Sequence, residues 1–223
     1  MRRSIVFALV VLVATAGLAG AQELKTDQDK TLYALGVALA NQLTPFALSP
    51  AEVDLVKAGL TDAALNRPHQ AEPKEYMGKI QELRTQRAAV VAAAEKKAGD
   101  AYLGKAAAEP GAKKLDSGVI ITTLKPGTGP SPKATDKVKV HYHGTLTDGT
   151  VFDSSVQRGQ PATFALNSVI KCWTEGVQQM KVGGKSRLVC PSNLAYGDRG
   201  APPRIKPGAA LVFEVELLDI VTK

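Results

Sequence analysis

A proline-free segment from about Lys74 to Ala108 constrains the fold of this chain more than any other feature. It is rich in Ala, Glu, Lys, Gln and Arg, which all favour the α-helix. One helix of that length would extend about 50 Å at 1.5 Å per residue. Its apolar stripe is thin, running from Met77 to Ala101, and we expect its far half to be a solvated linker. The segment therefore separates two parts of the chain that follow different patterns.

The part before this segment predicts two shorter helices. Leucines recur at helical spacing from Leu32 to Leu43, and Ser49-Pro50-Ala51-Glu52 has the order of a capping box with proline at the first helical position. Two short helices are marginal as an independent core. We therefore expect a second copy of the chain to cover their apolar faces, giving a homodimer through residues 22–73. The alternative is that these helices pack on the rest of the chain.

The part after Glu109 changes to a period of two residues, which is typical of strands. Alternating segments predict strands at 119–124, 137–142, 186–189 and 210–220, and Asp148-Gly149 predicts a hairpin turn. Residues 168–180 show helical spacing instead. The pattern predicts an α+β domain in which an antiparallel sheet carries one short helix on a face.

The first residues have the pattern of a secretory signal peptide. Two arginines precede the apolar run from Ile5 to Val13, and Ala19-Gly20-Ala21 suits signal peptidase, so we expect cleavage before Gln22. An uncleaved membrane anchor is the alternative. We predict a mature protein without a membrane span, exported to the periplasm or else secreted or associated with the outer membrane. The predicted domains are residues 1–21, the signal peptide; 22–113, the helical dimerisation domain with its long helix; and 114–223, the α+β domain.

Composition excludes several classes of protein. The chain is 44% hydrophobic and 22% charged, which is the globular range. Its net charge of +7 comes from 28 basic and 21 acidic residues, and the excess is dispersed over residues 114–223 without a basic run, which argues against a nucleic-acid partner. Two cysteines and three histidines are too few for a zinc module or a metal cluster.

Several blocks of the last 110 residues carry a family resemblance. They occur in the order Val140–Gly144, Gly149–Ser155, Val169–Trp173, Glu175–Val177, Ala195–Gly197 and Leu211–Leu217. In these blocks the chain resembles the FKBP-type peptidyl-prolyl cis-trans isomerases. Its layout is similar to the exported bacterial group of macrophage infectivity potentiator (Mip) and FkpA-like proteins. The resemblance implies an FKBP-like antiparallel sheet wrapped on one short helix, preceded by a helical dimerisation domain.

The resemblance also implies an apolar bowl that binds an X–Pro segment. Isomerisation of X–Pro makes no bond to the enzyme, so it requires no nucleophile, metal or cofactor. The main-chain contact to the bound peptide falls on Ile170, and the bowl has Trp173 as its floor. Asp153 is expected as a buried carboxylate, in a polar network with Tyr142 and Arg158. The implied catalytic residues are Asp153, Tyr196 and Tyr142, and the implied substrate-binding residues are Phe152, Arg158, Val169, Ile170, Trp173, Ile205 and Phe213.

The chain departs from the family pattern at four positions. Ala162 stands where many members have an aromatic ring, with Phe164 nearby, and Arg204 stands where many are apolar. These two changes bear on substrate preference and on affinity for macrolide inhibitors. Cys172 and Cys190 replace the usual glycine and apolar residue, and in an exported protein this predicts a disulfide between them, two buried free thiols being the alternative.

The resemblance implies a prolyl isomerase with chaperone activity that assists the folding of exported proteins containing X–Pro bonds. An alternative is a non-catalytic chaperone or binding module that only holds Pro-containing segments. A third possibility, a surface adhesin or virulence factor, has no sequence signal of its own.

Overall fold

The computed structural model describes residues 23–221, so the predicted signal peptide lies outside the described residues. The chain divides into two units, one ending at Leu39 and one beginning at Ala40. Helix α1 (Asp27–Leu43) starts with a reciprocal cap, because the Asp29 N–H donates to Thr26 Oγ1 at 3.0 Å and the Asp29 carboxylate accepts from the Thr26 N–H at 2.8 Å. Across residues 23–221, no helix combines the length and the apolar character needed to cross a membrane.

Helix α2 (Pro50–Ala64) follows the one-turn helix η1 (Thr44–Phe46) and begins with the predicted capping box. The Ser49 side chain accepts from the Glu52 N–H, and the Glu52 carboxylate accepts from the Ser49 N–H at 2.7 Å. The same carboxylate forms an ion pair with Arg87 at 2.6 Å. One glutamate therefore both starts α2 and joins it to the next helix.

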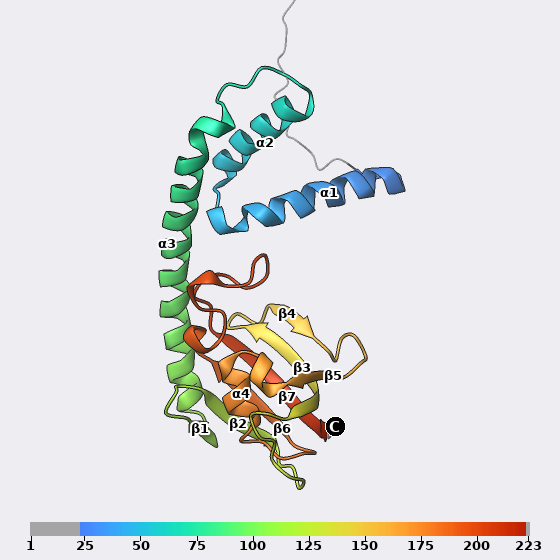
Figure 1. Ribbon diagram of the computed structural model, residues 1–223, viewed down its shortest axis with the longest axis vertical. Helices are drawn as coiled ribbons and strands as arrows, with labels where there is room; N and C mark the ends of the chain where they lie inside the picture. Colours follow the sequence, from blue (N-terminus) through green and yellow to red (C-terminus); the bar gives the residue numbers. More distant parts are fainter. Residues whose placement is uncertain (1–22, 222–223) are drawn as a thin grey trace, which may run out of the picture. The chain divides into compact units, whose positions relative to one another are not determined.

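The proline-free segment forms the single helix α3 (Pro73–Ala107), which runs beside the sheet in Figure 1. Our expectation that its far half is solvated is wrong. Ala92, Gly99 and Ala106 are buried, and Ala106 packs on apolar residues of the sheet. These small residues recur every seven positions, so they lie along one face and let the helix backbone approach the sheet closely.

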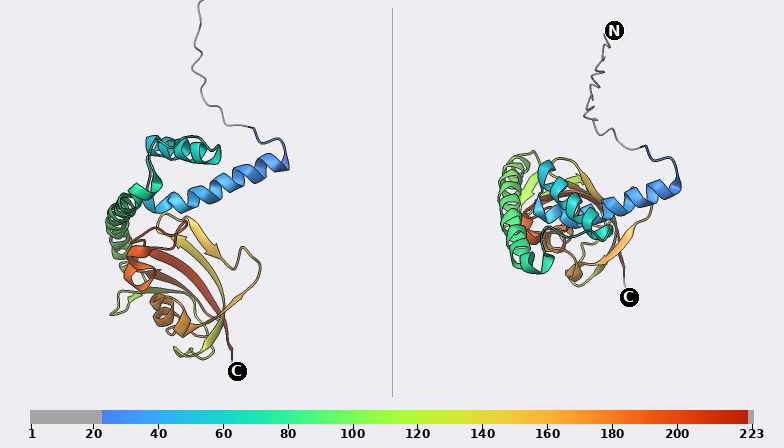
Figure 2. Two further views of the ribbon diagram at one scale, coloured as in Figure 1. Left: turned by 45° about the horizontal axis from the view of Figure 1, so that its top comes forward. Right: turned by 90° about the horizontal axis from the view of Figure 1, so that it is seen from above.

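Within the described residues the C-terminal part of the chain forms one seven-stranded antiparallel sheet, and the α+β prediction is confirmed. The strand order is β1-β2-β6-β7-β3-β4, with β5 also paired to β3. The longest pairing joins β3 and β7, which curve side by side in Figure 2. The elements are β1 (Ala112–Lys114), β2 (Ile120–Lys125), β3 (Lys137–Leu146), β4 (Val151–Ser154), β5 (Ala162–Ala165), η2 (Leu166–Ser168), α4 (Lys171–Val177), β6 (Lys185–Cys190), η3 (Ser192–Leu194), η4 (Gly197–Arg199) and β7 (Leu211–Val221).

Both faces of this sheet are covered where β2, β6 and β7 lie together. Leu211, Phe213 and Val215 of β7 point into the main core with α4, whereas Val212 points the other way and packs with Ala106 of α3. Successive side chains of a strand alternate between faces, so two covering layers make the strands apolar on both sides. The last turns of α3 therefore belong to the fold of the sheet.

The second-half helix is shorter than predicted. Helical spacing indicated 168–180, but α4 covers only Lys171–Val177. Val169 is extended, with φ −109° and ψ 177°, and Ile170 is the N-cap. The apolar residues before the helix therefore belong to an extended entry segment.

Candidate functional site

Five aromatic rings meet on the face of the sheet that packs against α4, with Trp173 of α4 at their centre. Trp173 is only 4% exposed. Its ring stands edge-on to Tyr142, Phe164 and Phe213, with ring centroids 5.4, 5.6 and 5.4 Å away. Phe152 packs on Phe213 in the same way at 5.4 Å. Edge-to-face pairs of this kind fix the orientation of each ring, so the cluster is a rigid apolar surface.

Gly144 of β3 makes this packing possible. A Cβ atom at position 144 would lie 2.7 Å from the ring of Phe152 and 3.1 Å from that of Phe213. Any other residue at this position would push the two rings apart. The glycine that ends the sequence block Val140–Gly144 is therefore required for steric reasons.

A polar network borders the aromatic cluster at β3, β4 and the following turn. The Tyr142 hydroxyl donates to the Asp153 carboxylate, and the Arg158 guanidinium donates both to that carboxylate and, at 2.9 Å, to the Tyr142 hydroxyl oxygen. Arg158 also lies over the Tyr142 ring, 5.6 Å from its centroid. Each of the three side chains therefore contacts the other two, as the family resemblance implied.

Burial and the hydrogen bonds of this network shift the pKa values of Asp153 and Tyr142. Burial acts to raise the pKa of Asp153, but the hydrogen bonds from Tyr142 and Arg158 outweigh it and the pKa lies below its ordinary value. Burial, and then the hydrogen bond to the Asp153 carboxylate, raise the pKa of Tyr142. At neutral pH the network holds an ionised carboxylate and a neutral phenol.

Our expectation that Asp153 is buried is wrong. Its side chain is 41% exposed, because β4 is the edge strand of the sheet and the carboxylate faces the rim of the aromatic cluster. It opens onto a cleft of about 780 Å³. Phe152, Arg158, Arg204 and Lys206 also line this cleft, which adjoins the polar edge of the cluster.

Sequence reasoning missed the residue that holds Tyr142 in place. Ser155 is fully buried, and its hydroxyl accepts a hydrogen bond from the Tyr142 N–H at 2.8 Å while its own N–H donates to the Tyr142 carbonyl at 3.0 Å. The serine pair after Asp153 stood in the quoted sequence block. Only the β3–β4 register, which pairs His143 with Ser154, shows what this serine contacts.

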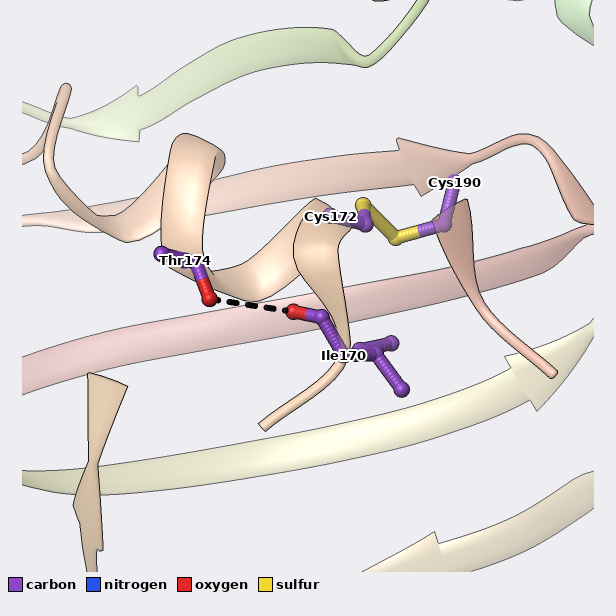
Figure 3. Close-up of a disulfide and its surroundings, with 4 residues drawn as sticks. All are labelled: Ile170, Cys172, Thr174 and Cys190. Carbon is purple, nitrogen blue, oxygen red and sulfur yellow. Dashed lines mark hydrogen bonds between the residues drawn. A yellow bond between two sulfur atoms is a disulfide. The ribbon is translucent and has the colours of Figure 1, made fainter. Parts of the chain in front are cut away.

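The entry to α4 brings Val169 and Ile170 beside the aromatic cluster. The Ile170 carbonyl accepts from the Trp173 N–H at 2.9 Å and from the Thr174 hydroxyl at 3.5 Å, the second bond being drawn in Figure 3. No hydrogen bond formed among residues 23–221 uses the Ile170 N–H. This donor is therefore available at the edge of the apolar surface.

The structure joins Cys172 and Cys190 by a disulfide, as their departure from the family pattern predicted. Both residues are fully buried and their Cα atoms are 5.6 Å apart. Figure 3 shows the bond between the first turn of α4 and the end of β6. It ties the helix that carries Trp173 to the central part of the sheet.

The loop from Tyr196 to Gly208 forms a further side of the site. Ile205 is buried in the same core as Trp173, whereas Tyr196 is 42% exposed. Arg204 donates a hydrogen bond to the Phe152 carbonyl at 2.7 Å, so it closes over β4. Near Ala162, Phe164 packs edge-on to both Tyr142 and Trp173 and partly replaces the missing aromatic wall.

Comparisons with known proteins agree with this arrangement. Residues 129–218 match the family of FKBP-type peptidyl-prolyl cis-trans isomerases, and residues 28–120 match the domain amino terminal to FKBP-type peptidyl-prolyl isomerase. The FKBP-type peptidyl-prolyl cis-trans isomerase FkpA of Aeromonas hydrophila is 42% identical over 210 residues, covering 89% of this chain and 78% of the relative. The FKBP-type 22 kDa isomerase of Escherichia coli is 40% identical over 204 residues, covering 88% and 97%.

A solved structure extends the likeness over most of the chain. The crystal structure of FkpA from Escherichia coli matches with a TM-score of 0.66 at 34% identity, over 89% of this chain and 98% of that one. The motifs, the aromatic site and these relatives point to one conclusion. The chain belongs to the FKBP-type peptidyl-prolyl cis-trans isomerases and is an enzyme of that type.

Proposed function

We propose that the aromatic cluster around Trp173 and the network of Tyr142, Asp153 and Arg158 are the site at which this enzyme isomerises X–Pro bonds. The observation that carries the proposal is their contact: one rigid apolar surface has one fixed set of polar groups at its rim. An X–Pro amide has a barrier near 20 kcal/mol because twisting removes its resonance. The twisted amide is less charge-separated, so an apolar surface favours it over the planar ground state.

The proposal also assigns the substrate-binding residues. Proline would rest on Trp173, and the free Ile170 N–H would donate to the peptide backbone. The walls of the site would be Phe152, Val169, Ile205 and Phe213. Arg158 would lie at the rim, where it binds Asp153 and Tyr142.

The proposed catalytic residues are the polar ones at the rim. Asp153 is ionised and positioned by Tyr142, and it faces the twisting amide. The hydroxyl of half-exposed Tyr196 would donate to the substrate carbonyl. None of these groups forms a bond to the substrate, so the site works by binding the transition state more tightly than the ground state.

Two variants test the site directly. Tyr196→Phe and Asp153→Leu should each lower kcat/KM in a protease-coupled assay on a Leu-Pro peptide, by the equivalent of about 1–3 kcal/mol for a lost fixed hydrogen bond. Tyr33→Phe is the matched control, because Tyr33 lies exposed on α1. Circular dichroism should show all three folded. Wild-type activity in both site variants would refute the proposed roles.

We also propose that the chain is a homodimer through residues 22–73. No residue of α1 or α2 is buried, and Leu32, Leu35 and Leu60 are each more than half exposed. Apolar faces of this kind need a partner in water, and a second copy supplies an identical face. Light scattering should give a dimer for the mature chain and a monomer for a chain that begins near residue 88. A chain that begins near residue 88 keeps the buried part of α3, which packs on the sheet. A monomeric mature chain would contradict the proposal.

A dimer would also support chaperone activity on unfolded proteins with X–Pro bonds. Two linked sites raise the effective concentration of the second once the first has bound a client. The mature chain should therefore suppress client aggregation better than the monomeric shortened chain at equal site concentration. Equal suppression would refute the contribution of the dimer and favour simple holding by a single site.

The location that fits these features is the periplasm. The signal sequence directs export, and a buried disulfide persists in an oxidising compartment. Amino-terminal sequencing of the protein from a periplasmic fraction should read from Gln22. Recovery only from the outer membrane or the medium would favour those alternatives, and a retained Met1 would contradict cleavage.

A further inference from the structure

The loop from Tyr196 to Gly208 is closed on itself by backbone hydrogen bonds. Ala201 and Ile205 donate to each other's carbonyls at 2.8 and 3.0 Å, and the Gly208 N–H donates to the Gly197 carbonyl at 2.9 Å. The two arms of the loop, one before Ala201 and one after Ile205, are thus tied together. The loop should therefore shift as one body, and Tyr196 and Ile205 would shift with it.

This loop rests directly on the backbone of α3. Gly208 has φ +76°, and a Cβ atom there would lie 2.4 Å from the Ala92 carbonyl oxygen. Glycine is therefore required by both conformation and space. About two turns further along the same face of α3, a Cβ at Gly99 would lie 2.9 Å from the Ala210 Cβ. Helix and loop meet here with almost no side chain between them.

Two ion pairs flank this contact. Glu95 Oε1 lies 2.8 Å from Lys206 Nζ, and the next residue of α3, Lys96, places its Nζ 2.7 Å from Asp198 Oδ1. The two α3 residues have opposite charges and each holds one arm of the loop. Exchanging the arms would bring like charges together, so the pairs fix the orientation of the loop as well as its distance.

Lys206 also lines the same cleft as Asp148. Its hydrogen bond with Glu95 raises the pKa of its ammonium, and the charge of Asp148 raises it further. Asp148 lies in the turn that leads into β4, which carries Phe152 and Asp153. One lysine on the loop thus pairs with a carboxylate on the helix and is also attracted by the charge of a second carboxylate on the turn before the site.

We propose that Glu95 of α3 is a positioning residue for isomerisation, acting through Lys206 to hold the loop that carries Tyr196 and Ile205. The inference rests on the proposed roles of those two residues. Without the ion pair, the loop would occupy the binding position for only a fraction of the time. The apparent affinity for substrate would fall in proportion to that fraction, whereas the rate of isomerisation in the bound state would not change. The structure therefore assigns Glu95 an effect on KM rather than on kcat.

The test is a double-variant cycle in the mature chain, with kcat and KM measured separately on a Leu-Pro peptide. Glu95→Ala and Lys206→Met should each raise KM about threefold to tenfold with kcat unchanged. This range lies between the small cost of losing a partly exposed ion pair and the larger cost of displacing a positioned group. The double variant should be no worse than either single one. Lys206→Arg should keep the wild-type KM. Glu82→Ala, on the same helix but away from the loop, is the matched control.

Each result decides the inference. A rise in KM that is shared by both single variants, is not increased in the double variant and is absent in the control supports it. Additive effects, a fall in kcat alone or wild-type kinetics overturn it. Tyr196→Phe measured beside them separates the two proposals: if it is impaired while Glu95→Ala is normal, the site stands and the positioning role fails. Normal activity in Tyr196→Phe removes the proposed role of Tyr196, on which the positioning role of Glu95 depends, and so overturns the inference. If Glu95→Ala does not fold, Lys206→Met and Lys206→Arg still give the comparison.

Discussion

Reducing the bond between Cys172 and Cys190 should destabilise the isomerase domain by about 3 kcal/mol. The two residues are 18 apart in the sequence, and closing a loop of that size removes about 3 kcal/mol of chain entropy from the unfolded state. Both cysteines are fully buried, so after reduction the two thiols remain in the core as small apolar groups, once their sulfur atoms have separated. No atom other than hydrogen is added or removed, and the difference therefore measures the cross-link alone.

Trp173 makes this difference measurable in the mature chain. It is the single tryptophan of the protein, it follows Cys172 directly, and it is buried. Its fluorescence in urea therefore reports the unfolding of this domain rather than of the helices before it. With a slope of about 1.5 kcal/mol per molar urea, the midpoint should fall by about 2 M when a phosphine reductant is added.

The variant Cys172→Ala with Cys190→Ala is the control, because its midpoint should not respond to the reductant. A shift below about 0.5 M in the wild-type chain would refute the entropic estimate. Two titratable thiols in the denatured, unreduced protein would refute the bond itself.

Three further predictions concern pH and packing. The hydrogen bonds from Ser49, and then that from Arg87, lower the pKa of Glu52 from 4.5 to about 2. The contribution of Glu52 to stability is therefore complete above about pH 4.5 and is lost as the pH falls toward 2. Glu52→Gln should remove that part of the pH dependence of unfolding, measured by circular dichroism. Gly99→Leu should destabilise the chain by about 1–3 kcal/mol in urea, because its side chain would force α3 away from the sheet; an unchanged midpoint would contradict the close contact. Arg158→Leu should raise the pKa of Asp153, so the acid limb of the kcat/KM profile should move to higher pH, and an identical profile would argue against a role for the carboxylate.

Local sequence was sufficient for the features that depend on near neighbours. The capping box at Ser49 and Glu52 and the length of α3 follow from residues within a few positions of each other, and the structure has both. The order of the isomerase motifs predicted the aromatic cluster and the contact of Tyr142 with Asp153 and Arg158. The family resemblance supplied that part, because nothing in the spacing alone brings β3, β4 and α4 together.

The tertiary structure decided what depends on distant partners. The far half of α3 was predicted to be solvated because its apolar stripe is thin, and the residues of that stripe are small. In the fold, that small size is what allows Ala92 and Gly99 to touch the loop and sheet at backbone distance. A residue's size can be read from the sequence, but whether it leaves a surface bare or lets another backbone approach depends on what lies opposite. The ion pair of Glu95 with Lys206 spans 111 positions, and only the folded chain brings the two charges together.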